Sequence, residues 1–147
     1  GPERSLPARN REDAWRAALI EAGRPVPDVV RGDWSAESGY HATRALLKTQ
    51  RPSALFAGND QMALGAYRAL FEAGVRIPED VSVVGCDNID EAGSFSPPLT
   101  TMLMDWDLIG RQALQVALGM LDDPTPTILT TPSTLIVRAS TAPPPAR

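Results

Sequence analysis

Three short polar clusters, each opened by a glycine, hold the residues best suited to binding chemistry. They lie at residues 32–34 (GDW), 58–61 (GNDQ) and 85–88 (GCDN), and each follows a short apolar run that is typical of a buried strand. Carboxylate and amide groups form hydrogen bonds with the hydroxyls of a polyol, and ligands of open parallel sheets bind beyond the carboxyl ends of the strands. The clusters therefore predict a binding crevice at one edge of a sheet.

Helix capping is the alternative interpretation for part of these clusters. Ser35, Asn59 and Asp60 stand where the following helices are expected to begin, and such side chains commonly accept hydrogen bonds from the first helical turn. Capping is favoured for Ser35, while capping and ligand contact stay equally open for Asp60. Asp87 precedes a loop rather than a helix, so capping explains it less well.

Arg11 is unusual because it falls on the apolar stripe of an expected helix. Helical spacing places it on the same face as Trp15, Ala18 and Ala22. A guanidinium buried there needs a partner or a ligand, because an unpaired buried charge is unfavourable. The simpler interpretation is an arginine whose head reaches water from the helix end.

The sequence gives little support to catalysis. It contains no G-x-S-x-G, P-loop or G-x-G-x-x-G motif, and the loop acids Asp87, Asp90 and Glu91 are more simply explained as solvated side chains. Cys86 is the one cysteine and His41 the one histidine, which argues against a zinc cluster. We therefore expect no enzyme activity, no metal site and no cofactor.

Composition places the chain among globular proteins of one domain. It has 147 residues, 43% of them hydrophobic and 22% charged, with a formal net charge of −4. This acidic balance does not predict a nucleic-acid surface, and no apolar run is long enough to span a membrane. A single cysteine excludes an internal disulfide, and no signal-peptide pattern opens the sequence. We therefore expect a cytoplasmic location, with no membrane partner.

Helix and strand patterns alternate along the chain. Helices are expected at residues 7–22, 35–48, 60–73 and 107–121, and strands at 29–32, 54–57, 81–85 and 100–104. Residues 128–137 are extended but contain Pro132, which predicts an edge strand for part of them. Crossovers of about 20 residues suit parallel strands, so we expect an α/β fold, a three-layer sandwich with a mostly parallel sheet. Residues 142–147 are proline-rich and expected to be disordered.

Four stretches match the sequence signatures of one family in their order along the chain. They are residues 54–66 (ALFAGNDQMALGA), 74–87 (GVRIPEDVSVVGCD), 97–101 (PPLTT) and 137–141 (VRAST). With residues 32–39 (GDWSAESG), they resemble the LacI/GalR, or lactose-repressor, family of bacterial transcriptional regulators over nearly the whole chain. Cys86 stands where that family usually has an aromatic residue, and Asn88 where it commonly has a second aspartate. These departures bear on ligand preference rather than on the family.

The resemblance implies a type I periplasmic-binding-protein-like core of two subdomains joined by crossover strands. Residues 1–141 would supply the C-terminal half of this effector-binding and dimerisation domain, and the helix at 105–121 would belong to the N-terminal subdomain. The helix-turn-helix headpiece that binds operator DNA, and most of the N-terminal subdomain, are expected to lie outside these residues.

The resemblance also implies a set of effector-contacting residues. Carried over by position along the resemblance, they are Arg11, Trp34, Asn59, Asp87 and Trp106, with Gln61 and Ile109 nearby. An indole face stacks on the C–H face of a pyranose, and charged or amide groups bind its hydroxyl rim. The effector is therefore expected to be a neutral sugar, a galactoside or a glucoside.

Two functions from different classes follow. The first is a sugar-responsive, DNA-binding transcriptional regulator of carbohydrate-utilisation genes, a repressor whose hold on operator DNA changes when the effector binds. The second is a periplasmic sugar-binding protein of a transport system, since that class shares the fold. The PPLTT and RAST motifs favour the repressor. The resemblance then implies a homodimer, with an interface at the apolar residues Leu46, Leu47, Tyr67 and Phe71, expected to be exposed, and at a loop near Phe95.

Overall fold

The computed structural model describes residues 1–120, 125 and 129–144. Its helices are α1 (Leu6–Glu21), α2 (Ala36–Thr49), α3 (Asp60–Glu72) and α4 (Trp106–Gly119), with a 3₁₀ helix η1 (Asp90–Ser94). Its strands are β1 (Ala54–Phe56), β2 (Ser82–Cys86), β3 (Thr100–Met104) and β4 (Ser133–Ile136). Apart from the strand at 29–32, every expected helix and strand has a counterpart within a few residues of its predicted bounds.

The described strands form one sheet in the order β1-β2-β3-β4. β1 and β2 are parallel, β2 and β3 are parallel, and β3 and β4 are antiparallel. Within it Val83 is paired with Leu55, and Val84 with Thr100. The α/β class and the mostly parallel sheet are confirmed, and part of residues 128–137 is an edge strand as expected. Residues 126–128 lie outside the described residues.

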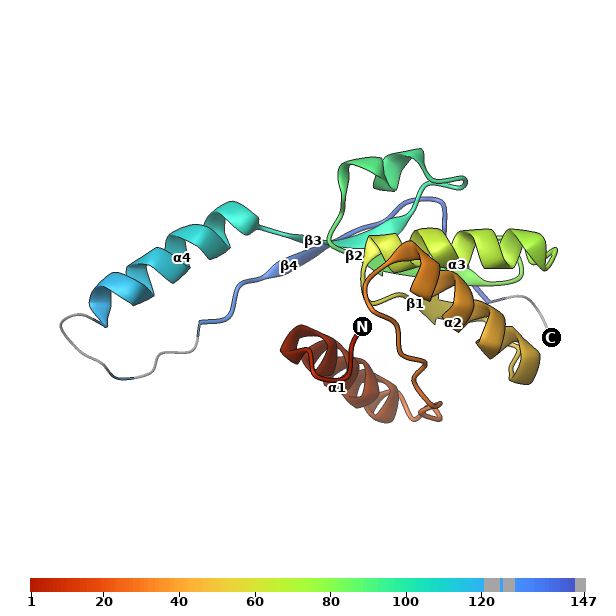
Figure 1. Cartoon of the computed structure of the whole chain (residues 1–147), viewed down its shortest axis with the longest axis horizontal. Helices are drawn as coiled ribbons and strands as arrows, with labels where there is room; N and C mark the ends of the chain where they lie inside the picture. Colours follow the sequence, from red (N-terminus) through yellow and green to blue (C-terminus); the bar gives the residue numbers. More distant parts are fainter. Residues whose placement is uncertain (121–124, 126–128, 145–147) are drawn as a thin grey trace.

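α2 and α3 form a helical layer beside the sheet (Figure 1). They approach closely because Gly65 has no side chain: a Cβ on this residue would lie 1.8 Å from the carbonyl oxygen of Ala36. Ser35 caps α2, as expected, and Asn59 caps α3 by accepting a hydrogen bond from its first turn. Asp60, the first residue of α3, is therefore left for another role.

The core lies between α3, β2 and the loop that precedes β3. Leu70, Val83 and Leu99 are fully buried there, each with 0% of its surface exposed. Tyr67 and Phe95 join the same cluster with their rings edge to face, 5.1 Å apart between centroids. This cluster is where the chain buries its largest apolar side chains.

Of the four dimer candidates expected to be exposed, Phe71 is exposed, Leu46 and Leu47 are partly buried, and the expectation is wrong for Tyr67. Tyr67 and Phe95 are buried, because the loop before β3 folds over α3 and covers this face. Leu47 packs against the same core, and Leu46 lines a cavity, whereas Phe71 is 84% exposed. Helical spacing could not reveal a cover supplied by a distant loop. The dimer interface itself stays a prediction.

Residues 29–32 do not form the expected strand. Val30 and Leu55 of β1 both line a cavity of about 200 Å³ that separates the two segments. A strand needs a ladder of backbone hydrogen bonds to its neighbour, and the cavity interrupts that contact. The side chain of Arg31 is bound instead to Glu12 of α1. β1 is therefore the other edge of the described sheet.

α4 projects from the body of the molecule on the outer ends of β3 and β4 (Figure 1). We call residues 103–119 with 133–134 the arm. No residue of α4 is buried, and Leu114 and Leu118 are 61% and 55% exposed. The apolar face predicted for this helix thus packs on no inner layer within the described residues, and Leu121, which was assigned to the same face, lies outside them.

The last described segment returns to the sheet. The N–H of Ala142 donates to the hydroxyl of Ser82, which donates back to the carbonyl oxygen of Ala142. Ala142, the first residue of the segment expected to be disordered, is therefore hydrogen-bonded to the sheet. Residues 145–147 of that segment lie outside the described residues. Among the described helices, none is both long enough and apolar enough to cross a membrane.

Candidate binding site at the strand ends

Arg11 joins the ends of two strands. From α1 it donates through Nη1 to the carbonyl oxygen of Gly58 at 2.6 Å, and through Nη2 to Asp87 Oδ1 at 3.0 Å. Its guanidinium carbon also lies 5.4 Å from the ring centre of Trp34. With 24% of its side chain exposed, Arg11 is a partnered, largely buried cation. The interpretation in which its head simply reaches water is wrong.

Asp87 faces Arg11 in surroundings with little water. Its side chain is 24% exposed. Burial raises the pKa of this carboxyl above its ordinary value, and the nearby Arg11 guanidinium opposes the rise. The ionised carboxylate is therefore stabilised mainly by Arg11 rather than by solvent.

Backbone strain is concentrated at this site. The non-glycine residues with positive φ in the described chain are Trp34 (78°), Asp87 (115°) and Asn88 (50°). Each such conformation costs on the order of 1–3 kcal/mol and persists only where surrounding contacts hold it. The site is thus built from residues that the rest of the fold must keep in place.

Asn59 contributes to the site and caps α3 at once. Its Nδ2 donates to the carbonyl oxygen of Trp34 at 3.0 Å and to Gln61 Oε1 at 2.9 Å, while its Oδ1 accepts from the N–H of Met62. Both amide hydrogens are therefore already used within the chain. A ligand contact by the Asn59 amide nitrogen requires that one of these bonds be exchanged.

The structure brings together five of the seven predicted effector contacts, Arg11, Trp34, Asn59, Gln61 and Asp87. The other two lie on α4: Trp106 begins the helix and is 60% exposed, and Ile109 is partly exposed one turn later. Within the described residues, no hydrogen bond or ring contact joins either side chain to the Arg11 cluster. Their role as effector contacts stays a prediction.

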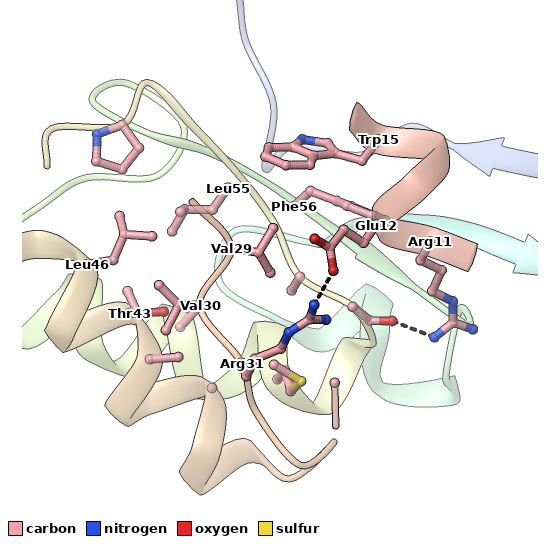
Figure 2. A pocket seen from close by; sticks show the side chains of 18 of the residues that line it. Arg11, Glu12, Trp15, Val29, Val30, Arg31, Thr43, Leu46, Leu55 and Phe56 are labelled. Atoms are coloured by element: carbon pink, nitrogen blue, oxygen red, sulfur yellow. Dashed lines mark hydrogen bonds and ion pairs between the residues drawn. The ribbon is translucent and has the colours of Figure 1, made fainter. Parts of the chain in front are cut away.

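A cavity of about 200 Å³ opens beside Arg11 and Trp34 and extends between α1, residues 27–31, α2 and β1. Figure 2 shows Arg11 at one end of it and the ion pair of Glu12 with Arg31 within it. Its other walls are mostly apolar and include Trp15, Val29, Leu46, Leu55 and Phe56. Arg11, Trp34 and Gly58 are therefore the parts of the strand-end cluster that line this cavity, whose polar lining also includes the Glu12–Arg31 ion pair.

Sequence reasoning missed a buried carboxylate behind Asp87. Asp60 has 0% of its surface exposed. It accepts hydrogen bonds from the N–H of Ile89 at 3.0 Å and from the hydroxyl of Thr101 at 2.6 Å. The PPLTT motif contains Thr101, but a motif does not tell which partner its hydroxyl binds.

Arg138 holds the same loop from another direction. Its Nη2 donates to Asn88 Oδ1 at 2.8 Å and its Nη1 to the carbonyl oxygen of Leu99 at 2.7 Å. Arg138 belongs to the VRAST motif, which was assigned no role at the site. Arg138 of this motif thus helps to hold the loop that carries Asp87 by a hydrogen bond to Asn88.

Cys86 precedes Asp87 and is buried. Its Sγ lies 3.5 Å from Asp87 Oδ1, and burial raises the pKa of the thiol to about 11. A thiol with this pKa is protonated at neutral pH and is a poor nucleophile and metal ligand. Within the part of the chain that the structure describes, no group of three or more His, Cys, Asp or Glu side chains is arranged to hold a metal ion.

An open, mostly parallel sheet with a polar cluster at its strand ends is the architecture of one half of a periplasmic-binding-protein-like domain. The family model of the periplasmic binding protein-like domain matches residues 1–141, and the chain belongs to this family. Its curated homologues are repressors of the LacI/GalR family, which confirms the resemblance.

Two of these relatives define the extent of the match. The ribose operon repressor of Escherichia coli is 41% identical over 128 residues, which are 85% of this chain and 39% of that repressor. The lactose operon repressor of Klebsiella pneumoniae is 41% identical over 145 residues, 97% of this chain and 41% of that repressor. The chain thus spans about two fifths of the length of these relatives.

Solved structures agree with the family and the fold. The Lac repressor dimer bound to operator and the anti-inducer ONPF matches with a TM-score of 0.89 and 36% identity, over 96% of this chain and 50% of that one. A LacI family transcriptional regulator from Enterococcus faecium with bound ribose gives 0.76 and 32%, over 92% and 52%. The complex of the transcriptional regulator CelR with cellobiose gives 0.87 and 34%, over 95% and 44%.

Proposed function

We propose that this chain is the effector-binding and dimerisation part of a sugar-responsive DNA-binding repressor of carbohydrate-utilisation genes. One observation carries the proposal: a single cation, Arg11, joins Gly58 and Asp87 at two strand ends beside Trp34. The relatives support it, because they include two operon repressors and solved regulators with bound ribose or cellobiose. In this proposal residues 105–121 belong to the N-terminal subdomain, and a separate headpiece binds operator DNA.

The effector we assign to the site is a neutral sugar, a galactoside or a glucoside. Asp87 accepts and Arg11 donates, so the pair matches two neighbouring hydroxyls of a pyranose. Trp34 offers an indole face beside them for the C–H face of the ring. A purine also stacks on an indole, but it has no need of a carboxylate and a guanidinium converging on adjacent hydroxyls.

Calorimetry on the full-length regulator tests this assignment. The panel holds lactose, galactose, glucose and cellobiose, compared with adenine, hypoxanthine and glucose 6-phosphate. We expect saturable binding of a neutral sugar and none of the purines or the phosphate ester. A mobility-shift assay with operator DNA should then show a change in affinity when that sugar is added.

The two assays separate the parts of the proposal. Binding of a purine or an anionic metabolite alone would overturn the sugar assignment and leave the repressor assignment standing. Failure to bind any DNA specifically would overturn the repressor assignment and favour the alternative, a periplasmic sugar-binding protein of a transport system. The operator-bound relative favours the repressor. With that function we assign a homodimer, a cytoplasmic location and no catalytic reaction to the protein.

A further inference from the structure

Three consecutive backbone N–H groups of the loop after β2 are bound by other elements. We call residues 87–89 the effector loop. Its N–H groups donate, in chain order, to the carbonyl oxygen of Met102 at 2.9 Å, to Thr101 Oγ1 at 3.3 Å and to Asp60 Oδ2 at 3.0 Å. Two of these three acceptors belong to one side-chain pair, because Thr101 also donates to Asp60 Oδ1 at 2.6 Å.

Both oxygens of the Asp60 carboxylate take part in this arrangement. Each of its oxygens accepts one hydrogen bond, and the residue has 0% of its surface exposed. Gly85 leaves the necessary room, since a Cβ at this position would lie 2.1 Å from Asp60 Oδ1. Among the ion pairs of the described residues none includes Asp60, so N–H and O–H donors hold its charge.

We propose that Asp60 is a positioning residue for effector binding, which fixes the effector loop so that Asp87 faces Arg11. The inference rests on the proposed function of the Arg11 cluster. Asp87 and Asn88 both have positive φ. A strained backbone of this kind relaxes when the hydrogen bonds that hold it are removed. Within the described residues, Asp60 forms no hydrogen bond or ion pair with the predicted sugar-binding groups Arg11 and Trp34 that would give it a direct role.

The two donors at this position suit a carboxylate. Two donors, the N–H of Ile89 and the hydroxyl of Thr101, converge on Asp60. An asparagine would offer one oxygen acceptor and turn an NH₂ donor toward the other. If the asparagine oxygen accepts from Ile89, the Thr101 hydroxyl loses the hydrogen bond that it donates to this residue, while the size of the side chain stays the same.

The test is Asp60→Asn in the full-length regulator, with Ser140→Ala as a matched control. Ser140 is also 0% exposed, and its hydroxyl binds the carbonyl oxygen of Val83 and the N–H of Thr100, but no atom of the effector loop. Both changes should lower the thermal midpoint. Only Asp60→Asn should weaken calorimetric affinity for the bound sugar, by about tenfold or more, which corresponds to one lost hydrogen bond to a charged group. Unchanged affinity in Asp60→Asn, or an equal loss in Ser140→Ala, would overturn the proposal.

A second pair of variants decides the matter if Asp60→Asn does not fold. Thr101→Val removes the hydroxyl with little change in volume, and Thr101→Ser keeps it. We expect the valine variant to lose affinity and the serine variant to keep it within about twofold. Equal affinities in the two variants would refute a positioning role for the Asp60–Thr101 pair.

Amide hydrogen exchange tests the same inference without a ligand. In Asp60→Asn the N–H of Ile89 should exchange at least about tenfold faster than in the unchanged protein, while Ser140→Ala should leave it as it was. If the regulator binds no sugar, the proposed function fails, yet this measurement still decides whether Asp60 fixes the loop. Unaltered protection of Ile89 in Asp60→Asn would overturn the inference.

Discussion

At the strand ends, polar side chains are bound to other parts of the chain, whereas on the arm apolar side chains face solvent. Arg11, Asn59 and Asp60 each make two or more hydrogen bonds within the described residues. On the arm, Leu114 and Leu118 are more than half exposed. Groups held in place before a ligand arrives form a preorganised site, while an exposed apolar face fits a covering partner. The contacts within the described residues therefore hold the binding groups in position, whereas they leave the apolar face of the arm uncovered.

The largest expected effect compares a buried leucine of the body with an exposed leucine of the arm. In the 147-residue chain, Leu70→Ala should lower the free energy of unfolding by about 2–5 kcal/mol, because Leu70 is 0% exposed. Leu114→Ala should change it by less than about 0.5 kcal/mol, because that side chain is 61% exposed. Urea unfolding followed by circular dichroism measures both. Equal losses would show that α4 packs against the body and would remove the contrast.

The next effect concerns the cation that joins the strand ends. Arg11→Ala in the full-length regulator should weaken sugar binding by about 1.5–3 kcal/mol, a tenfold to hundredfold loss. Affinity for operator DNA without sugar should not change, because the headpiece that binds DNA is proposed to be a separate part of the protein. Arg11→Lys is the control. It keeps the charge but loses the planar guanidinium that reaches Gly58 and Asp87 together, so its affinity for the sugar should fall between those of the wild type and Arg11→Ala. Wild-type affinity in Arg11→Ala would contradict the assigned site.

Two carboxyls near the strand ends should have pKa values that are shifted in opposite directions. Hydrogen bonds from the Ser35 hydroxyl and N–H, with one from Ser38, hold the pKa of Asp33 at about 2, whereas burial raises the pKa of Asp87 above 3.8. The stabilising contribution of Asp33 is present above its unfolded pKa and is lost as the pH falls through about 2. The stabilising contribution of Asp87 is present below its unfolded pKa and is lost as the pH rises through its folded pKa.

Carbon-13 NMR of the carboxyl groups measures both pKa values directly. Asp87→Asn should remove the loss of stability that accompanies ionisation of Asp87, and Asp33→Asn should remove a stabilising contribution at neutral pH. A pKa for Asp87 below its ordinary value of 3.8 would show that Arg11 outweighs burial, and that more water reaches the site than its geometry indicates.

The smallest expected effect on folding is at Phe71. Because it is 84% exposed, Phe71→Ser should change the free energy of unfolding of the monomer by within about 0.5 kcal/mol. In the full-length regulator the same change should weaken the dimer, which sedimentation velocity would show. Leu6→Ser, another exposed apolar side chain, is the control and should leave the dimer intact. A tetramer of the unchanged protein at micromolar concentration would contradict a dimer as its largest assembly.

Local patterns predicted most of the fold, while contacts between distant residues escaped them. Ser35 as a cap and the bounds of β3 follow from neighbouring residues, so the sequence was sufficient for both. The hydrogen bond between Asp60 and Thr101 joins residues 41 positions apart, and no period or spacing indicates it. The strand expected at residues 29–32 depends on a partner across a gap, which a run of valines cannot guarantee.

The site shows the same division. The family resemblance pointed to Arg11 and Asp87, and the anomaly of a cation on an apolar stripe pointed to Arg11 independently of it. Positive φ at Trp34, Asp87 and Asn88 was not foreseeable, because these residue types adopt other conformations freely and only tertiary contacts impose this one. The burial of Tyr67 likewise depends on a loop that folds back over α3.

β3 belongs to both of the contrasted regions. Thr101 and Met102 are paired with β2 on one side and with β4 on the other, whereas Leu103 and Met104 are paired with β4 alone. The residues that anchor the effector loop are thus followed directly by those that carry α4, within one antiparallel ribbon. Because β3 and β4 are hydrogen-bonded along this ribbon, the orientation of α4 is tied to the strand segment that contains Thr101 and Met102. The orientation of the arm and the geometry of the effector loop therefore share a single mechanical element.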